Sequence, residues 1–258
     1  MSNRSIHTLL KSWDEECPLT REEAVEVLNL PEEEMDSLME CAYALRTKYK
    51  GKKVSVQLLT NVRSGNCTQN CAYCAQSKDS QAEIEKYKRV SDEKLYGDND
   101  LVDEKHLARH CIGLSGIGFS DEEIEDLADR IREMKKKDTQ ICCSIGFLTE
   151  KQARILKDAG LDRINHNLNS SRSFYPEICT THTYDQRVNN IKMLQSLGFE
   201  ICSGGIVGMG ESKEDIVDML MDLREINPES VPINFLLPIP GTRLACLLYT
   251  SDAADEED

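Results

Sequence analysis

Residues 141–166 read ICCSIGFLTEKQARILKDAGLDRINH and contain one strand–helix–strand unit. The apolar runs at 141–145 and 162–166 each predict a strand. Between them, Thr149 with Gln152 three residues later is typical of a helix N-terminus, and Gly160 marks the end of that helix. A strand, a helix and a second strand in this order predict two parallel strands joined by a helical crossover.

The same unit recurs along the chain and predicts an α/β fold. Strands are expected at 54–60, 111–115, 141–145, 162–166, 199–207 and 231–237, and helices at 120–136, 149–160, 183–198 and 212–226. Residues Gly97 to Asp100 interrupt the first crossover, so only 101–108 is expected to be helical there. A (β/α)8 TIM-type barrel needs eight strands in about 250 residues. The sequence therefore predicts an incomplete barrel of about six βα units. A doubly wound sheet is the alternative, but no GxGxxG loop follows the first strand.

The two ends of the chain differ in character from the repeat. Residues 1–52 predict an N-terminal helical extension, with a capping box at Thr20 and Glu23, Pro31 in a first turn and Gly51 as a stop. The barrel is expected over 53–245. The tail 246–258, CLLYTSDAADEED, resembles the translation of a sequencing adapter, with a native acidic tail as the alternative. On this interpretation the chain is a C-terminally truncated fragment.

Composition narrows the class of protein. Lys and Arg number 31 against 46 Asp and Glu, a net charge of −15, which argues against a nucleic-acid surface. No apolar run reaches the roughly 20 residues of a membrane span, and the N-terminus has no signal-peptide pattern, so a cytoplasmic protein is expected. Eleven cysteines in such a chain indicate metal ligands or catalysis rather than disulfides.

Three of those cysteines form the most specific motif. Cys67, Cys71 and Cys74 make CxxxCxxC just after the first predicted strand. Three thiolates so close together can hold three irons of a [4Fe–4S] cluster and leave the fourth iron open. A closed zinc site is the alternative, but the sequence lacks a second CxxC or HxxxH partner.

In this position the motif resembles the signature of the radical S-adenosylmethionine superfamily. The resemblance implies that S-adenosyl-L-methionine binds the open iron and that its reductive cleavage yields a 5′-deoxyadenosyl radical. It also implies no catalytic side chain beyond the cluster and cofactor ligands.

Longer stretches are similar to the biotin synthase family. They are SGNCTQNCAYCAQS, AGLDRINHNLNSS, FYPEICTTHTYDQRV, EICSGGIVGMGES and PESVPINFLLPIPGT, within a similarity that covers about residues 19–245. The resemblance implies sulfur insertion into dethiobiotin, a reductant such as flavodoxin or ferredoxin, and a homodimer. Two alternatives stay open. One is another radical enzyme, such as a hydrogenase-cofactor maturase or a methylornithine synthase, and the other is a non-catalytic metal-binding or interaction module.

The resemblance further implies a second, sacrificial [2Fe–2S] cluster as sulfur donor. Its ligands are expected to be Cys111, Cys142 and Cys202 on three different strands, with Cys143 facing away because strand side chains alternate. The fourth ligand in the family is an arginine on a seventh strand, for which this sequence offers no candidate. Cys17, Cys41 and Cys179 are expected to have no metal role.

The remaining expected site residues also come from the resemblance. Cofactor contacts are expected from Tyr73, His166, Asn167, Asn169, Arg187, Gly204, Gly205 and Glu211, and dethiobiotin contacts from Asn167 and Asn234. Asn169 stands where an aspartate is common in the family. Because the missing strands would line the barrel, the fragment alone is expected to be poorly soluble and to make no biotin, while its first cluster can still assemble.

Overall fold

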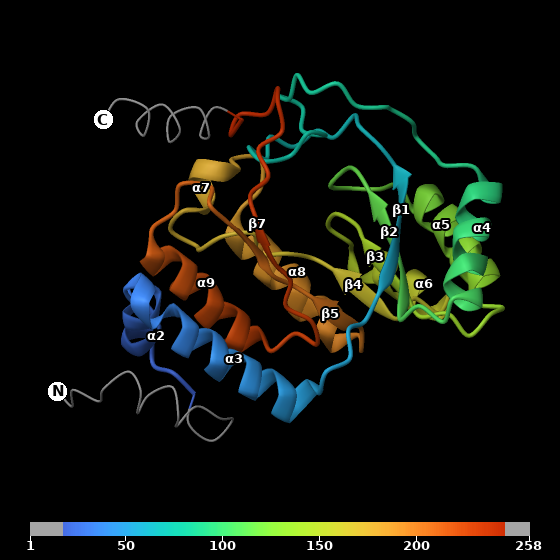
Figure 1. Cartoon of the computed structure of the whole chain (residues 1–258). Coiled ribbons are helices and arrows are strands. Elements are labelled where there is room, and N and C mark those ends of the chain that lie inside the picture. The colour runs from blue at the N-terminus through green and yellow to red at the C-terminus, as the bar shows by residue number, and fades with distance from the viewer. Residues whose placement is uncertain (1–17, 246–258) are drawn as a thin grey trace.

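The computed structural model describes residues 18–245, so the expectations for Cys17 and the tail 246–258 fall outside the described residues. Figure 1 shows a curved wall of strands with helices along its outer side. Five strands pair in parallel in chain order, and two further strands form a small parallel sheet beside them. The strands are β1 (Gln57–Arg63), β2 (Arg109–Leu114), β3 (Ile141–Ser144), β4 (Arg163–Asn165), β5 (Glu200–Cys202), β6 (Gly205–Val207) and β7 (Ile233–Phe235).

The strand expected over 199–207 is divided into β5 and β6. Ser203 and Gly204 separate the two pieces, and single bridges from Asn169 to Gly205 and from Cys202 to Ser230 join the small sheet to the large one. In the described part of the chain β1 does not pair with β7, so the barrel is open there. Apolar side chains are exposed on both strands, Leu59 at 69% and Phe235 at 81%.

The helices of the repeat are α4 (Asp92–Glu104), α5 (Asp121–Met134), α6 (Glu150–Asp158), α7 (Tyr175–Ile178), α8 (Tyr184–Ser196) and α9 (Lys213–Ile226). Helices α5, α6, α8 and α9 begin where the sequence predicts, whereas α4 begins earlier than expected and α7 was not expected. Capping boxes start α5 at Ser120, α6 at Thr149, α8 at Thr183 and α9 at Ser212. None of the helices within residues 18–245 is both long enough and apolar enough to cross a membrane.

The expectation of an interrupted first crossover is wrong. Helix α4 is continuous from Asp92, although it contains Gly97 and several short polar residues. Its polar residues are buried because tertiary partners satisfy them: the Thr60 hydroxyl donates to Asp98 over 2.7 Å, and the Asn99 amide donates to the Met134 carbonyl over 3.1 Å. Packing against β1 and α5 thus outweighs weak helix propensity.

The N-terminal segment is helical, as the sequence indicates. It comprises α2 (Arg21–Leu28), a 3-10 turn (Glu32–Glu34) and α3 (Met35–Lys50), which ends at Gly51 with a positive φ of 64°. Helix α2 lies against α9, where the Arg21 guanidinium pairs with the Asp218 carboxylate. This extension therefore packs against the outer helix α9.

The core lies between the sheet and the outer helices. The face of the sheet that is directed toward these helices carries a row of paired residues. Ile112, Cys143, Ile164 and Ile201 are in register on β2 to β5, and all four are fully buried. The neighbouring row along the same strands therefore points to the inner face, where the polar and thiol side chains gather.

Candidate active site

The CxxxCxxC motif lies in a loop that leaves the end of β1. Gly65 and Asn66 both have positive φ, 72° and 53°, and turn the chain just before Cys67. The Cys74 amide donates to the Cys71 carbonyl over 3.1 Å, which closes the turn between these two cysteines. Cys71 is buried, and Cys67 and Cys74 are half-buried. The loop therefore brings three thiols together on one side of the wall.

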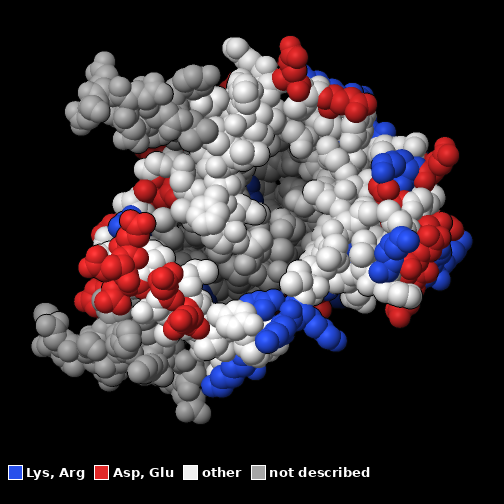
Figure 2. Space-filling model, in the orientation of Figure 1, with Lys and Arg blue, Asp and Glu red and all other residues white. Residues whose placement is uncertain are grey.

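Two of these thiols, those of Cys67 and Cys71, open into a central cavity of about 280 Å³. Its lining comes mainly from the carboxyl ends of the strands and the loops that follow them, where the active sites of such barrels lie. The other lining residues are Gln69, Tyr73, Leu114, Gly116, Ile117, Ser144, Ile145, Gly146, Phe147, Asn165, His166, Asn167, Asn169, His182, Arg187, Ile206 and Asn234. Figure 2 shows the hollow at the centre of the molecule, largely uncharged inside, while acidic side chains gather over α2 and α9.

Arg187 supplies the positive charge of this cavity. Its guanidinium donates to the Tyr175 hydroxyl (2.5 Å) and the Asn167 carbonyl (3.1 Å), and Nη2 lies 2.8 Å from His182 Nε2. Among the described residues no carboxylate forms an ion pair with it. A guanidinium held by neutral partners can still receive an anion, and a carboxylate suits its planar fork.

His166 is a neutral side chain of the same cavity. Burial lowers the pKa of its imidazole to about 3, with the nearby Arg187 acting in the same direction. Its Nε2 atom is buried and has no hydrogen-bond partner within the described chain. An unsatisfied buried nitrogen on a residue that lines a cavity is a place where a polar ligand group can bind.

Four more of the expected residues line the cavity: Tyr73, Asn167, Asn169 and Asn234. Asn167 is fixed by the chain that follows β5, since its Oδ1 accepts a hydrogen bond from the Gly204 amide over 3.1 Å. Asn169 adopts a positive φ of 72°, a conformation that asparagine tolerates better than most residues. The structure thus brings six expected cofactor and substrate residues to one space.

Three expected cofactor residues lie elsewhere, and their positions have a packing reason. A Cβ on Gly204 would lie 1.8 Å from the Pro232 carbonyl oxygen, and one on Gly205 would lie 2.1 Å from the Met219 sulfur. The Glu211 carboxylate accepts hydrogen bonds from the amides of Gly208 and Met209. None of the three lines the cavity. Both glycines therefore have a packing reason, against the chain before β7 and against α9, and their contact with the cofactor stays a prediction.

A second thiol set lies on the inner face of the strands. Cys111 and Cys142 pair in register on β2 and β3, and the same row continues through Arg163 and Glu200. One layer nearer the cavity, the Asn165 amide contacts the Cys202 sulfur at 3.2 Å. Cys143 belongs to the opposite, core-facing row. The three cysteines expected for the second cluster thus share one face.

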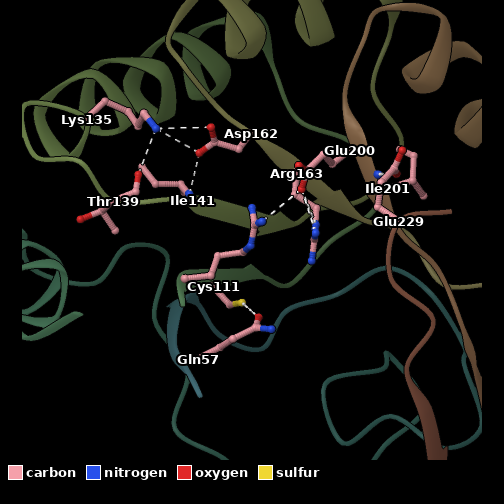
Figure 3. Close-up of polar contacts among 11 residues, drawn as sticks. Gln57, Cys111, Lys135, Thr139, Ile141, Asp162, Arg163, Glu200, Ile201 and Glu229 are labelled. Atoms are coloured by element: carbon pink, nitrogen blue, oxygen red, sulfur yellow. Dashed lines mark hydrogen bonds and ion pairs between the residues drawn. The ribbon is translucent and has the colours of Figure 1, made fainter. Parts of the chain in front are cut away.

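Two guanidinium groups accompany this set. The Arg163 and Arg109 side chains both bind the Glu200 carboxylate, at 2.8 and 3.1 Å, and Figure 3 shows Arg163 and Glu200 beside Cys111. The Cys111 thiol lies 3.0 Å from the Gln57 side-chain oxygen. A hydrogen bond with Cys142, aided by the two arginines, lowers the pKa of Cys111 to about 7. Thiolates, which bind iron, are favoured in such surroundings.

Both thiol sets fit the groups that the sequence suggests. The loop presents three thiols beside a cavity whose lining has an unpaired cation and an unsatisfied nitrogen, as a [4Fe–4S] cluster with S-adenosyl-L-methionine requires. The inner face presents three thiols close to two cations, which suits an anionic [2Fe–2S] group.

Sequence reasoning missed several lining residues, among them Gln69, Phe147 and His182. His182 connects two parts of the site, because its ring contacts both the Gln69 side chain (3.0 Å) and Arg187. The only signal for His182 in the sequence was its place in the TTHTYDQR stretch, five residues before Arg187.

Comparison with known proteins agrees with this geometry. Residues 61–223 match the radical SAM superfamily, so the fold and the thiol loop define a radical S-adenosylmethionine enzyme. The chain is 42% identical over 228 residues to biotin synthase of Geobacillus kaustophilus (strain HTA426) and 40% identical over 227 residues to that of Bacillus subtilis (strain 168). Each match covers 88% of this chain and 68% of the relative. The chain belongs to the biotin synthase family.

Solved structures show the same architecture at lower identity. Methylornithine synthase (PylB) superposes with a TM-score of 0.81 at 18% identity, covering 92% of this chain and 68% of that one. The [FeFe]-hydrogenase maturase HydG gives 0.73 at 18% identity, covering 92% and 59%. These similarities establish the TIM-barrel-like fold, which both alternative enzyme classes share.

Proposed function

We propose that the protein, at the length of its relatives, inserts sulfur into dethiobiotin to form biotin. One observation carries the proposal: Asn165 lines the central cavity and also contacts Cys202 of the inner thiol set. The two thiol sets are thus adjacent levels of one site, with space for a substrate between them. Sequence identity to biotin synthases supports this activity over the two alternative radical enzymes, which share the fold alone.

The side chains that line the cavity have different expected roles in binding the cofactor and the substrate. When bound, the [4Fe–4S] cluster with S-adenosyl-L-methionine supplies a hydrogen-abstracting radical, and the [2Fe–2S] cluster supplies sulfur. Arg187 would hold the cofactor carboxylate, while neutral His166 and the amides of Asn167 and Asn169 would bind uncharged polar groups. Asn234 on β7 would hold the ureido ring of dethiobiotin, because an amide offers both a donor and an acceptor. The apolar lining residues Leu114, Ile117 and Ile206 would keep water from the reacting carbons.

We also propose a homodimer that works in the cytoplasm with a flavodoxin or ferredoxin as reductant. The family resemblance supports the dimer and the reductant. The net charge of −15 supports the absence of nucleic acid from its partners.

The test is an anaerobic assay with S-adenosyl-L-methionine, reductant and dethiobiotin, using protein carried to the full length of its relatives. We expect 5′-deoxyadenosine and biotin, both quantified by mass spectrometry. Formation of 5′-deoxyadenosine without biotin would favour another radical enzyme of this fold. Absence of both, despite a full complement of iron and sulfide, would contradict the proposal.

A further inference from the structure

A fourth cysteine lies against the thiol loop. The Cys179 sulfur, just after α7, is 3.8 Å from the Cys71 sulfur, and both residues are at least nine-tenths buried. Cys179 lies outside the CxxxCxxC motif and was expected to have no metal role. Cys71 is an expected cluster ligand. The proposed reaction, however, gives no role to its contact with a second buried thiol.

The backbone holds the two cysteines together from both sides. The Ala72 amide donates to the Ile178 carbonyl over 2.8 Å, and these residues are the direct neighbours of Cys71 and Cys179. On the other side, the Asn70 side-chain oxygen accepts hydrogen bonds from the amides of Thr180 and Thr181, at 3.0 and 3.3 Å. Because both flanks are fixed, the two sulfurs are held 3.8 Å apart, and a disulfide would shorten that distance to about 2 Å.

A metal site is the alternative use of this cluster, since His182 is also close. However, both ring nitrogens already have partners: Nδ1 lies 3.0 Å from the Gln69 oxygen, and Nε2 lies 2.8 Å from the Arg187 guanidinium. The Cys179 sulfur is 3.3 Å from Nδ1 and 3.8 Å from Nε2. A sulfur so nearly equidistant from both nitrogens does not lie on the lone-pair axis of either. The geometry therefore favours sulfur–sulfur chemistry over metal binding by these residues.

A small oxidant can reach the pair. Cys179 lines a second cavity, of about 350 Å³, together with Tyr175 and Thr183. Cys71 lines the central cavity. The two thiols thus line two different cavities: Cys71 lines the central cavity, and Cys179, which is not an expected cluster ligand, lines the second cavity.

We propose that Cys71 and Cys179 form a reversible disulfide when the [4Fe–4S] cluster is absent. Hydrogen peroxide transfers one oxygen to the Cys179 thiol, giving a sulfenic acid and water. The Cys71 sulfur then attacks the Cys179 sulfur, and the Cys71 thiol proton leaves with the sulfenic hydroxyl as a second water, so two thiols and one peroxide become one disulfide and two waters. Cys179 thereby keeps the ligand Cys71 from irreversible oxidation until a thiol reductant restores it. The protective role rests on the proposed function, because it requires Cys71 to be a cluster ligand. Formation of the disulfide itself requires neither a cluster nor a substrate.

The experiment starts from protein freed of iron by a chelator under anaerobic conditions. One equivalent of hydrogen peroxide is added, free thiols are alkylated, and a tryptic digest is analysed by mass spectrometry without reduction. We expect peptide 64–78, which carries Cys67, Cys71 and Cys74, to be linked to peptide 173–187, which carries Cys179. Cys71→Ala and Cys179→Ala should abolish this linked pair, whereas Cys67→Ala and Cys74→Ala should retain it.

Two results would overturn the proposal. One is alkylated Cys179 together with a disulfide inside peptide 64–78. The other is intact, unreactive Cys71 and Cys179 with bound zinc in metal analysis, which would establish the metal site instead. Protection of Cys71 is measured in a separate experiment. The protein is treated with peroxide, reduced with a thiol and reconstituted with iron and sulfide, and the [4Fe–4S] absorbance that it regains is recorded. Cys179→Ala should regain less than the matched variant Cys41→Ala, and equal recovery would contradict the protective role.

Discussion

The two thiol sets of this molecule are built in different ways. Cys67, Cys71 and Cys74 lie in one loop of eight residues, closed by its own backbone hydrogen bonds. Cys111, Cys142 and Cys202 come from three strands and meet only because those strands pair in register. The first set can therefore form locally, whereas the second depends on the whole sheet.

Because of this difference, the two thiol sets should respond differently to changes in strand packing. A loop set survives changes in strand packing as long as its turn is intact. A strand set is lost if one strand slips by a single residue, because every side chain then changes face. The following predictions use that contrast.

The largest effect is expected from the loop set. Replacing any one of Cys67, Cys71 and Cys74 by Ala should abolish cleavage of S-adenosyl-L-methionine, because one iron loses its protein ligand. The far-ultraviolet circular dichroism should stay close to that of the native protein, since the strands do not involve this loop. The measurement is 5′-deoxyadenosine formed per chain after anaerobic reconstitution. Undiminished cleavage by the triple variant would show that the cluster lies elsewhere.

The second prediction separates the two faces of β3. In protein carried to the length of its relatives, Cys142→Ala should remove the [2Fe–2S] absorption and sulfur insertion. Cys143→Ala should retain both, but should lose about 1–2 kcal/mol of unfolding free energy because Cys143 is fully buried in the core. Visible absorption and urea unfolding measure the two effects. The opposite assignment would mean that the register of β3 is off by one residue.

The third prediction concerns acidity at the cavity. The folded-state pKa of His166 is lowered to about 3, whereas the unfolded value is near 6.5, so the unfolded chain binds the extra proton first. The stability that this neutral histidine contributes is complete above pH 6.5 and is lost as the pH falls toward 3. We expect a loss of about 3 kcal/mol between pH 7 and pH 4 from this residue.

The matched variants for this prediction are His166→Gln and His106→Asn. His106 is exposed, so its variant should keep the native pH dependence of unfolding, whereas His166→Gln should flatten it. Equal slopes for both variants would show that His166 is not buried as a neutral group.

The smallest effect is expected at the strand set. In cluster-free protein, alkylation of Cys111 should rise through a midpoint near pH 7. Glu200→Gln removes the anion that both arginines bind, so the midpoint should fall, by less than about one unit because Glu200 is partly exposed. Arg163→Gln should move the midpoint upward. The rates are followed by mass spectrometry, and a shift in the same direction for both variants would contradict the assigned electrostatics.

Much of this architecture could be predicted from the sequence because its signals are local. Capping pairs such as Thr149 with Gln152 fix where helices begin, and the alternation along 141–145 places Cys142 and Cys143 on opposite faces. The CxxxCxxC spacing likewise indicates one loop.

The rest depends on contacts between distant segments. Helix α4 was predicted to be interrupted because Asp98 and Asn99 weaken a helix, yet Thr60 and Met134 satisfy them in the fold. Gly204 and Gly205 were expected to contact the cofactor, and the close approach of Pro232 and Met219 to these glycines could not be predicted from the sequence. The approach of Cys179 to Cys71 depends on how the loop after α7 meets the motif, which no spacing in the sequence reveals.

The contrast between a loop set and a strand set is tested most directly by Mössbauer spectroscopy of iron-57-reconstituted protein carried to the length of its relatives. The native protein should show both [4Fe–4S] and [2Fe–2S] signals. The triple variant of Cys67, Cys71 and Cys74 should lose only the former, and Cys142→Ala only the latter. Loss of both signals in either variant would contradict two independently assembled sites.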